Sequence, residues 1–146
     1  MAQHFFTQEQ KEAIVAAIKD AEQNTSGEVQ VHIESHCKKA VMDRAAEVFA
    51  MLHMHNTKLR NGVLIYVATV DRKFAIIGDA GINKAVPDGF WDDAKEDMLQ
   101  HFKYGNLIEG IVEGLAIAGE HLQKYFPHQV NGTNELSDDI AFMDGD

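Results

Sequence analysis

Three short segments, each beside a glycine, carry the side chains best suited to binding chemistry. They are Ser26-Gly27-Glu28, Arg60-Asn61-Gly62 and Gly78-Asp79-Ala80-Gly81. Glu28, Asn61 and Asp79 offer the hard oxygen atoms that Ca²⁺ and Mg²⁺ prefer. Arg60 offers a planar fork for a phosphate or a carboxylate, and glycine lets backbone amides approach a ligand closely. The metal ligands predicted here are Glu28, Asn61 and Asp79, with further ligand contacts from Ser26, Gly27, Arg60, Gly78 and Gly81.

The same residues have a simpler interpretation. Glycine and aspartate are typical of tight turns for backbone reasons, and an arginine beside them is typical of a surface ion pair. The composition of these segments does not separate a binding site from ordinary turns, so both interpretations stay open.

Three predicted strands position these segments. Residues 63–68 form a continuous apolar run, typical of a strand covered on both faces. Residues 73–78 follow after a short connection and should pair antiparallel with that strand. Residues 28–36 alternate between apolar and polar side chains, which predicts a half-buried strand near a sheet edge. Helical spacing over residues 40–54 makes 29–68 a strand–helix–strand unit, and such crossovers are parallel and right-handed. The three segments should therefore meet at one end of the sheet.

The opposite end of the sheet is the alternative. Ligands of open α/β sheets usually lie at the carboxyl ends of parallel strands, where this chain has His36, Cys37, Thr69 and Asp71. The sequence His32-x-Glu34-x-His36 also places three potential ligands on one strand face. Its spacing matches no zinc motif, and we expect that polar face to be solvated. Cys37 is expected to act as a small packing residue.

Helices are predicted on both faces of this sheet. Thr7 and Gln10 form a capping-box pattern before a helix that ends near Asn24. Further helices are predicted over residues 88–102 and 106–126. In the last one, Gly110, Gly114 and Ala118 recur every four residues, and we expect this flat seam to lie against the sheet. The predicted fold class is α/β, a small mixed β-sheet sandwiched between helices in three layers.

Composition divides the chain into residues 1–127, a single domain, and residues 128–146, an acidic tail. The net charge is −10, and the tail carries five acidic residues and no Lys or Arg. We expect the tail to be disordered, although Ile140, Phe142 and Met143 would suit a short docking segment. The acidic balance argues against nucleic-acid binding.

The chain shows no features of membrane insertion or export. No run approaches the roughly 18 apolar residues of a membrane helix, and the first residues lack the pattern of a signal peptide. A single cysteine allows no internal disulfide. We therefore expect a soluble, cytoplasmic protein.

Five motifs stand in order along residues 5–127. They are Thr25-Ser26-Gly27-Glu28-Val29, Arg60-Asn61-Gly62-Val63-Leu64-Ile65, Asp71-Arg72-Lys73, Ile77-Gly78-Asp79-Ala80-Gly81-Ile82 and Phe102-Lys103-Tyr104-Gly105. Together they resemble the TPM domain family, which includes a thylakoid-lumen protein linked to photosystem II repair and many membrane-anchored bacterial proteins. The resemblance implies a compact α/β sandwich, divalent-cation binding and an acid phosphatase activity that is unsettled. We expect this chain to depart from the family in lacking an anchor, and it has Asn61 where many members have an acidic residue.

Two functions follow from these expectations. The first is a binding module with a weak Ca²⁺ or Mg²⁺ site at the glycine-rich end. Its partner would be a protein, including one attached to a membrane, with no nucleic acid and no direct membrane insertion. The alternative is a metal-assisted acid phosphatase. That reaction needs two or three converging carboxylates, and only Glu28 and Asp79 have a reason to converge. Ser26 has no evident histidine partner, so we favour binding over catalysis.

Overall fold

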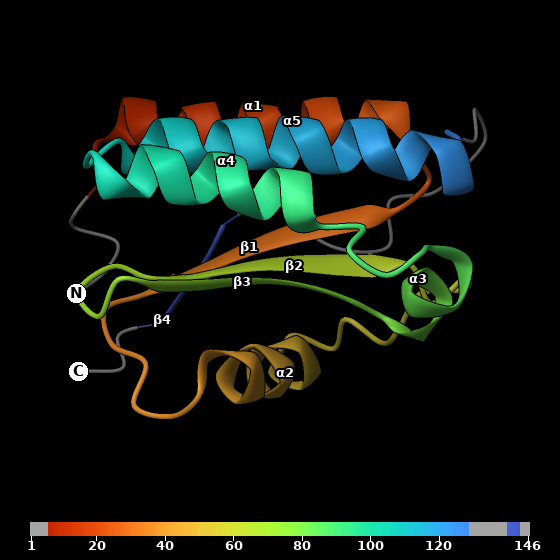
Figure 1. The fold of residues 1–146 in the computed structure, drawn as a ribbon, viewed down its shortest axis with the longest axis horizontal. Coiled ribbons are helices and arrows are strands. Elements are labelled where there is room, and N and C mark those ends of the chain that lie inside the picture. The colour runs from red at the N-terminus through yellow and green to blue at the C-terminus, as the bar shows by residue number, and fades with distance from the viewer. Residues whose placement is uncertain (1–5, 129–139, 144–146) are drawn as a thin grey trace.

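The computed structural model describes residues 6–128 and 140–143 of the protein (Figure 1). Those residues form helices and strands in an order close to the predicted one. The elements are α1 (Gln8–Asn24), β1 (Glu28–Glu34), α2 (Val41–Met51), β2 (Gly62–Ala68), β3 (Lys73–Gly78), α3 (Ala80–Ala85), α4 (Asp92–Lys103), α5 (Leu107–Tyr125) and β4 (Ala141–Met143).

The strands form one mixed sheet in the order β3-β2-β1-β4. β1 and β2 are parallel, with Glu28 opposite Gly62 and Glu34 opposite Ala68. β2 and β3 are antiparallel, with Val63 opposite Gly78. Both pairings confirm the crossover and the hairpin predicted from the sequence.

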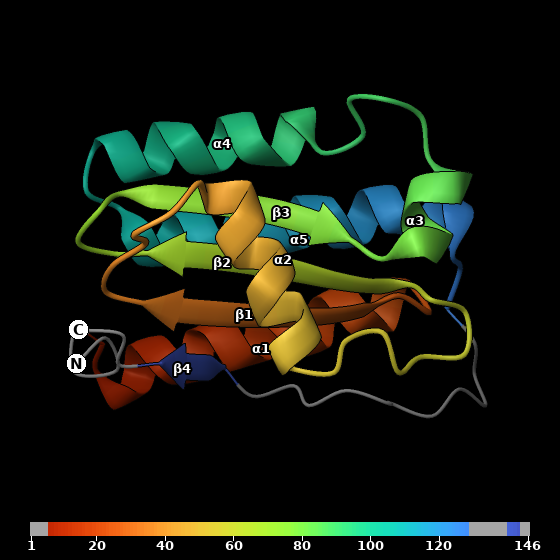
Figure 2. The same ribbon diagram turned by 90° about the horizontal axis from the view of Figure 1, so that it is seen from below.

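Helices cover both faces of this sheet. α1, α4 and α5 lie side by side over one face, and α2 lies alone over the other (Figures 1 and 2). Alternate strand residues face the three helices and form the larger apolar cluster, which includes Val29, Val31, Ile33, Val63, Ile65, Val67 and Ile76. The smaller cluster under α2 includes Leu64, Tyr66, Ala68 and Ala75. The three-layer α/β/α fold predicted from the sequence is therefore confirmed.

The position predicted for β1 is wrong. β1 lies inside the sheet, between β2 and β4, and all seven of its residues are buried. Its polar face is covered by α2, whose Arg44 pairs with Glu34. A buried polar face is stable only when its charges have partners, and this helix supplies one.

Two helical details also differ from the sequence analysis. The glycine seam of α5 packs against α4 rather than the sheet: a Cβ on Gly110 would lie 2.5 Å from Phe102 Cε1, and one on Gly114 would lie 2.5 Å from Met98 Sδ. α3 was not predicted, and begins where the Asp79 side chain accepts a hydrogen bond from the backbone N–H of Ala80. The capping box of Thr7 and Gln10 at the start of α1 is confirmed.

The acidic tail contributes a strand. β4 pairs in parallel with His32–Glu34 of β1, and Ile140 is 8% exposed within the larger apolar cluster. The expectation of disorder is therefore wrong for residues 140–143, because β4 pairs with the free edge of β1 and Ile140 packs into the apolar cluster. The domain predicted to end at residue 127 does not include β4, although β4 is part of the sheet. Residues 129–139 and 144–146 lie outside the described part of the chain.

No helix in the described ranges is long and apolar enough to cross a membrane.

The docking of β4 predicts a measurable contribution to stability. Ile140→Ala should reduce the free energy of unfolding by about 2 kcal/mol, since it removes a buried aliphatic side chain. Leu99→Ala is the matched control, because Leu99 is 49% exposed and its loss should change stability by less than about 0.5 kcal/mol. Urea unfolding measures both variants. Equal stabilities for the two would mean that β4 does not dock on the domain in solution.

Candidate functional site

The three glycine-flanked segments meet at one end of the sheet, called here the glycine-rich end, where β1 and β2 begin and β3 ends. Backbone hydrogen bonds join the segments: Glu28 N–H donates to Asn61 O at 3.2 Å, and Asp79 N–H donates to Gly62 O at 2.9 Å. The Asn61 side-chain amide also donates to Ser26 O at 3.2 Å. These residues thus meet as the predicted topology requires, while their ligand-binding role stays a prediction.

Asp79 is the centre of the polar contacts at this end. Its side chain is 2% exposed. Oδ1 accepts from Ala80 N–H at 2.7 Å and from Arg60 Nη2 at 2.8 Å, and lies 2.9 Å from His55 Nδ1. Oδ2 accepts from Arg60 Nε at 2.7 Å. Burial alone would raise the pKa of Asp79, but the hydrogen bonds from Arg60, Ala80 and His55 outweigh it and lower the pKa. Asp79 is therefore a buried anion at neutral pH.

Arg60 and His55 form the solvent side of this cluster. Their side chains are 47% and 50% exposed. The hydrogen bond to Asp79 raises the pKa of Arg60, and the His55 ring packs against Phe49 with centroids 4.7 Å apart. Arg60 has a φ of 52°, a left-handed conformation that is uncommon for a residue other than glycine. We call His55, Arg60 and Asp79 the Asp79 cluster. No pattern in the sequence connects His55 to this end.

The residues of this end fit a divalent cation poorly. The Arg60 guanidinium holds both Asp79 oxygens side-on, which is where a cation would bind. Glu28 and Asn61 are 5% and 2% exposed, and the Asn61 amide is already hydrogen-bonded to Ser26. Among the described residues, the set of three His, Cys, Asp or Glu side chains close enough to share a metal ion lies elsewhere.

The glycines at this end serve chain packing. A Cβ on Gly81 would lie 2.1 Å from Leu59 O, and the Gly81 N–H donates to Arg60 O at 2.8 Å. A Cβ on Gly78 would lie 2.8 Å from Ile82 Cβ, whereas one on Gly27 would make ordinary contacts of 3.4 Å or more. The Gly81 amide is therefore occupied by the protein's own backbone.

The opposite end of the sheet contains a smaller polar group. Asp71 Oδ2 accepts from Cys37 N–H at 2.7 Å, and Asp71 Oδ1 lies 3.1 Å from His36 Nδ1. These hydrogen bonds, with that of Cys37 the larger, lower the pKa of Asp71. Cys37 is buried, and its thiol donates to Lys39 O at 3.2 Å. Thr69 N–H donates to Glu34 O at 2.9 Å. These contacts fix the loops after β1 and β2 to each other.

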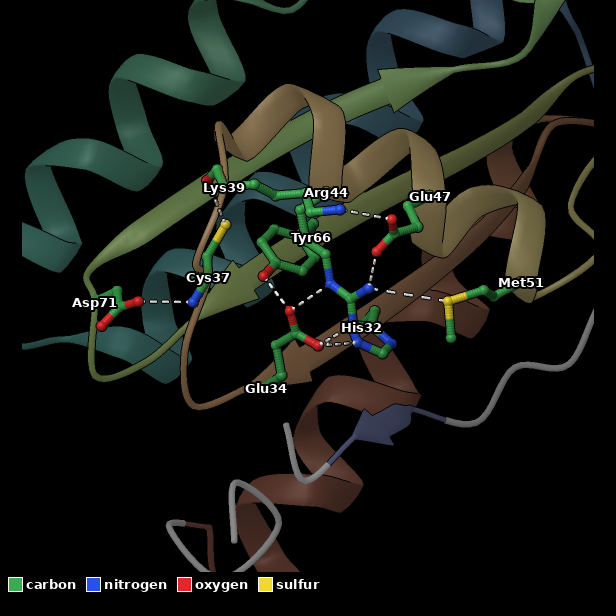
Figure 3. Close-up of polar contacts among 9 residues, drawn as sticks. All are labelled: His32, Glu34, Cys37, Lys39, Arg44, Glu47, Met51, Tyr66 and Asp71. Carbon is green, nitrogen blue, oxygen red and sulfur yellow. Dashed lines mark hydrogen bonds and ion pairs between the residues drawn. The ribbon is translucent and has the colours of Figure 1, made fainter. Parts of the chain in front are cut away.

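Between β1 and α2 lies a buried ionic network of His32, Glu34, Arg44 and Tyr66 (Figure 3). Arg44 binds the Glu34 carboxylate through two bonds, Nη2 to Oε1 at 2.8 Å and Nε to Oε2 at 2.9 Å. The Tyr66 hydroxyl donates to Glu34 Oε2, and His32 Nε2 lies 3.1 Å from Oε1. The side chains of His32 and Glu34 are each 1% exposed. The prediction of a solvated His32–Glu34 face is wrong.

Burial and hydrogen bonding shift the pKa values of this network in different directions. Burial alone would raise the pKa of Glu34, but bonds from Arg44, Tyr66 and His32 lower it to about 2. The pKa of Tyr66 is raised by burial and by the bond to Glu34. Burial lowers the pKa of His32, against the opposing effect of Glu34. The network at neutral pH is an Arg–Glu ion pair with two neutral partners, and it is enclosed by α2.

One signal for this network was present in the sequence. Arg44 lies three residues after Val41 and four before Val48, which places it on the apolar side of α2. A charged residue on an apolar helix face needs a buried partner, and the polar face of β1 is the nearest candidate. No comparable signal marks His55, which lies in the loop after α2.

Comparisons with known proteins found a matching family model and similar solved structures. A family model described as the TPM domain matches residues 2–120. The solved structure of the BA42 protein from the psychrophilic bacterium Bizionia argentinensis is 50% identical, with a TM-score of 0.90, covering 95% of this chain and 96% of that one. The comparison with curated proteins gave no match.

Two more distant structures share the fold alone. The N-terminal domain of a P. gingivalis protein is 21% identical with a TM-score of 0.69, covering 85% of this chain and 81% of that one. The N-terminal domain of a Corynebacterium glutamicum protein is 12% identical with a TM-score of 0.61, covering 95% and 80%.

The buried network predicts a specific pH dependence of stability. The folded pKa of Glu34, about 2, lies below its ordinary value of 4.5. The unfolded chain therefore takes up this proton first, and stability should fall from about pH 4.5 toward pH 2. In Glu34→Gln this part of the pH dependence should disappear. Urea unfolding across this range measures the difference.

Glu120→Gln is the control, since Glu120 is exposed on α5, and it should keep the full acid-dependent loss. If Glu34→Gln and wild type lost stability in parallel from pH 4.5 to pH 2, Glu34 would not be held as a buried anion.

Proposed function

This chain belongs to the TPM domain family, and from that premise we propose that it is a binding module whose contacts lie at the glycine-rich end. The supporting observation is the Asp79 cluster, in which a buried carboxylate holds a half-exposed arginine and a half-exposed histidine. The proposed ligand is an anionic group, a carboxylate or a phosphate, carried by a protein partner. Partners attached to a membrane are included.

The cluster is suited to anion binding because Arg60 is already oriented. Arg60 contacts Asp79 through Nε and Nη2, so Asp79 leaves the third guanidinium nitrogen, Nη1, unused. A side chain fixed before binding loses less conformational freedom when the ligand arrives. An anionic group would meet Arg60 and His55 together, both on the exposed side of the cluster.

Divalent cations would compete with Arg60 under this proposal. A Ca²⁺ or Mg²⁺ ion needs Asp79, with Glu28 and Asn61 as the other proposed ligands, and the guanidinium occupies Asp79 first. We therefore expect weak cation binding, with a dissociation constant of about 10⁻³ M, typical of sites with few charged ligands.

The alternative of a metal-assisted phosphatase has less support. It needs several carboxylates around the cation, and the candidates at this end are Glu28 and an Asp79 already paired with Arg60. A further buried carboxylate, Glu34, lies at the other end of β1 and is enclosed beneath α2. The donor set favours binding over catalysis.

The anion proposal predicts that Arg60 controls binding. Acetate and inorganic phosphate, titrated into ¹⁵N-labelled protein, should shift the backbone signals of the segments around Arg60 and Asp79. In Arg60→Gln these shifts should weaken at least about tenfold in apparent affinity, since a charge-assisted contact is lost.

Arg72→Gln is a matched control, because Arg72 is an exposed arginine with a similar φ of 54° in the β2–β3 turn. Shifts that are unchanged in Arg60→Gln, or lost equally in Arg72→Gln, would contradict anion binding at this end.

The cation proposal predicts an opposite effect of the same substitution. Removing the guanidinium frees Asp79, so Arg60→Gln should bind Ca²⁺ at least about tenfold more tightly than wild type. The measurement is the rise in melting temperature with Ca²⁺ concentration. Asp79→Asn in the Arg60→Gln background should remove that rise. A wild-type response equal to that of Arg60→Gln would mean that Ca²⁺ binds somewhere else.

A further inference from the structure

We propose that the α4–α5 helix pair carries a binding site for a borderline divalent metal ion of the Zn²⁺ type, formed by Asp97, His101 and Glu113. One ligand atom of each residue lies within 4.8 Å of the other two. This proposed α4–α5 site lies in the helical layer rather than at the glycine-rich end, and it does not depend on the proposed binding function.

Helical spacing aims the three side chains at one point. Asp97 and His101 are four residues apart on α4 and therefore share a helix face. His101 Nε2 contacts Glu113 Oε2 from α5 and lies 3.7 Å from Asp97 Oδ2. A single ring nitrogen thus faces two carboxylates from two helices.

A second observation concerns Asp97. Its Oδ2 atom is inaccessible to solvent and has no hydrogen-bond partner among the described residues. The 3.7 Å separation from His101 Nε2 is too long for a hydrogen bond. A buried carboxylate oxygen without such a partner requires an explanation, and a cation bound between the three side chains provides one.

The packing of the two helices holds this arrangement. Gly110 and Gly114 flank Glu113 on α5, and neither position has room for a Cβ beside Phe102 and Met98 of α4. The two helices therefore approach closely along this seam. Sites built on packed helices keep their geometry better than sites on loops.

The ligand types indicate which metal would bind. One imidazole and two carboxylates suit Zn²⁺, which accepts three protein ligands and leaves a fourth position for water. Ca²⁺ and Mg²⁺ prefer sets made of oxygen alone. Zn²⁺ ligand atoms lie about 3.4 Å apart in a tetrahedral site, so small rotamer changes would close the site. The side chains of Asp97, His101 and Glu113 are 31%, 26% and 51% exposed, which leaves a path for the ion.

The test is a Zn²⁺ titration of the metal-free protein, residues 1–146, monitored by the melting temperature. Wild type should gain melting temperature as Zn²⁺ passes its dissociation constant. His101→Ala and Glu113→Gln should each lower the apparent affinity at least about tenfold. His121→Ala is the matched control: His121 lies on α5 with a side chain 35% exposed, 3.2 Å from the single carboxylate of Asp93. It should respond as wild type does.

Nitrogen-15 NMR of the histidine rings then locates the ion independently of any variant. Zn²⁺ should shift His101 Nε2 before the rings of His55 and His121, and excess Ca²⁺ should not reverse the shift. The proposal would be overturned by a wild-type melting temperature indifferent to Zn²⁺, by an unchanged response in both His101→Ala and Glu113→Gln, or by first binding at another histidine.

Discussion

The burial of the β1 polar face is the constraint on which the rest of this fold depends. A carboxylate placed between a sheet and a helix is costly unless donors surround it, and Glu34 receives two bonds from Arg44 and one from Tyr66. Arg44 can reach Glu34 only if α2 packs on this face of the sheet. The ion pair therefore helps to fix the orientation of α2, and the loop after α2 then delivers β2 beside β1. The segments of the glycine-rich end meet because β1 and β2 begin side by side, with Glu28 opposite Gly62.

Two Arg–carboxylate pairs join the elements around β1 and β2, and they differ in exposure. Arg44, paired with Glu34, is 16% exposed, whereas Arg60, paired with Asp79, is 47% exposed. Both carboxylates are almost fully buried, so both pairs help to hold the fold together. Of the two arginines, only Arg60 is well exposed to solvent, and it lies where the three glycine-flanked segments meet. That difference in exposure is why we propose a binding surface at Arg60 and not at Arg44.

Local patterns predicted the parts of the structure that depend on neighbouring residues. The backbone conformation of a few neighbouring residues produces each of these patterns: the alternation in β1, the apolar run of β2 and the cap at Thr7. Contacts between distant segments were harder to predict. The spacing of Gly110 and Gly114 indicated a close approach but not its partner, which is α4. The burial of His32 and Glu34 depended on Arg44, ten residues away on another element. β4 pairs with a strand more than a hundred residues earlier, and His55 reaches Asp79 from a loop without a motif.

Asn61 connects the chemistry of this end to the family resemblance. Its side-chain amide donates to the Ser26 carbonyl, joining the turn before β1 to the turn before β2. A carboxylate, the residue type that the family resemblance implies for this position, cannot donate a hydrogen bond at neutral pH. It would face that carbonyl oxygen with like partial charge, and a cation between the two would relieve the repulsion. With asparagine the amide N–H makes the connection directly, and Arg60 supplies the positive charge beside Asp79.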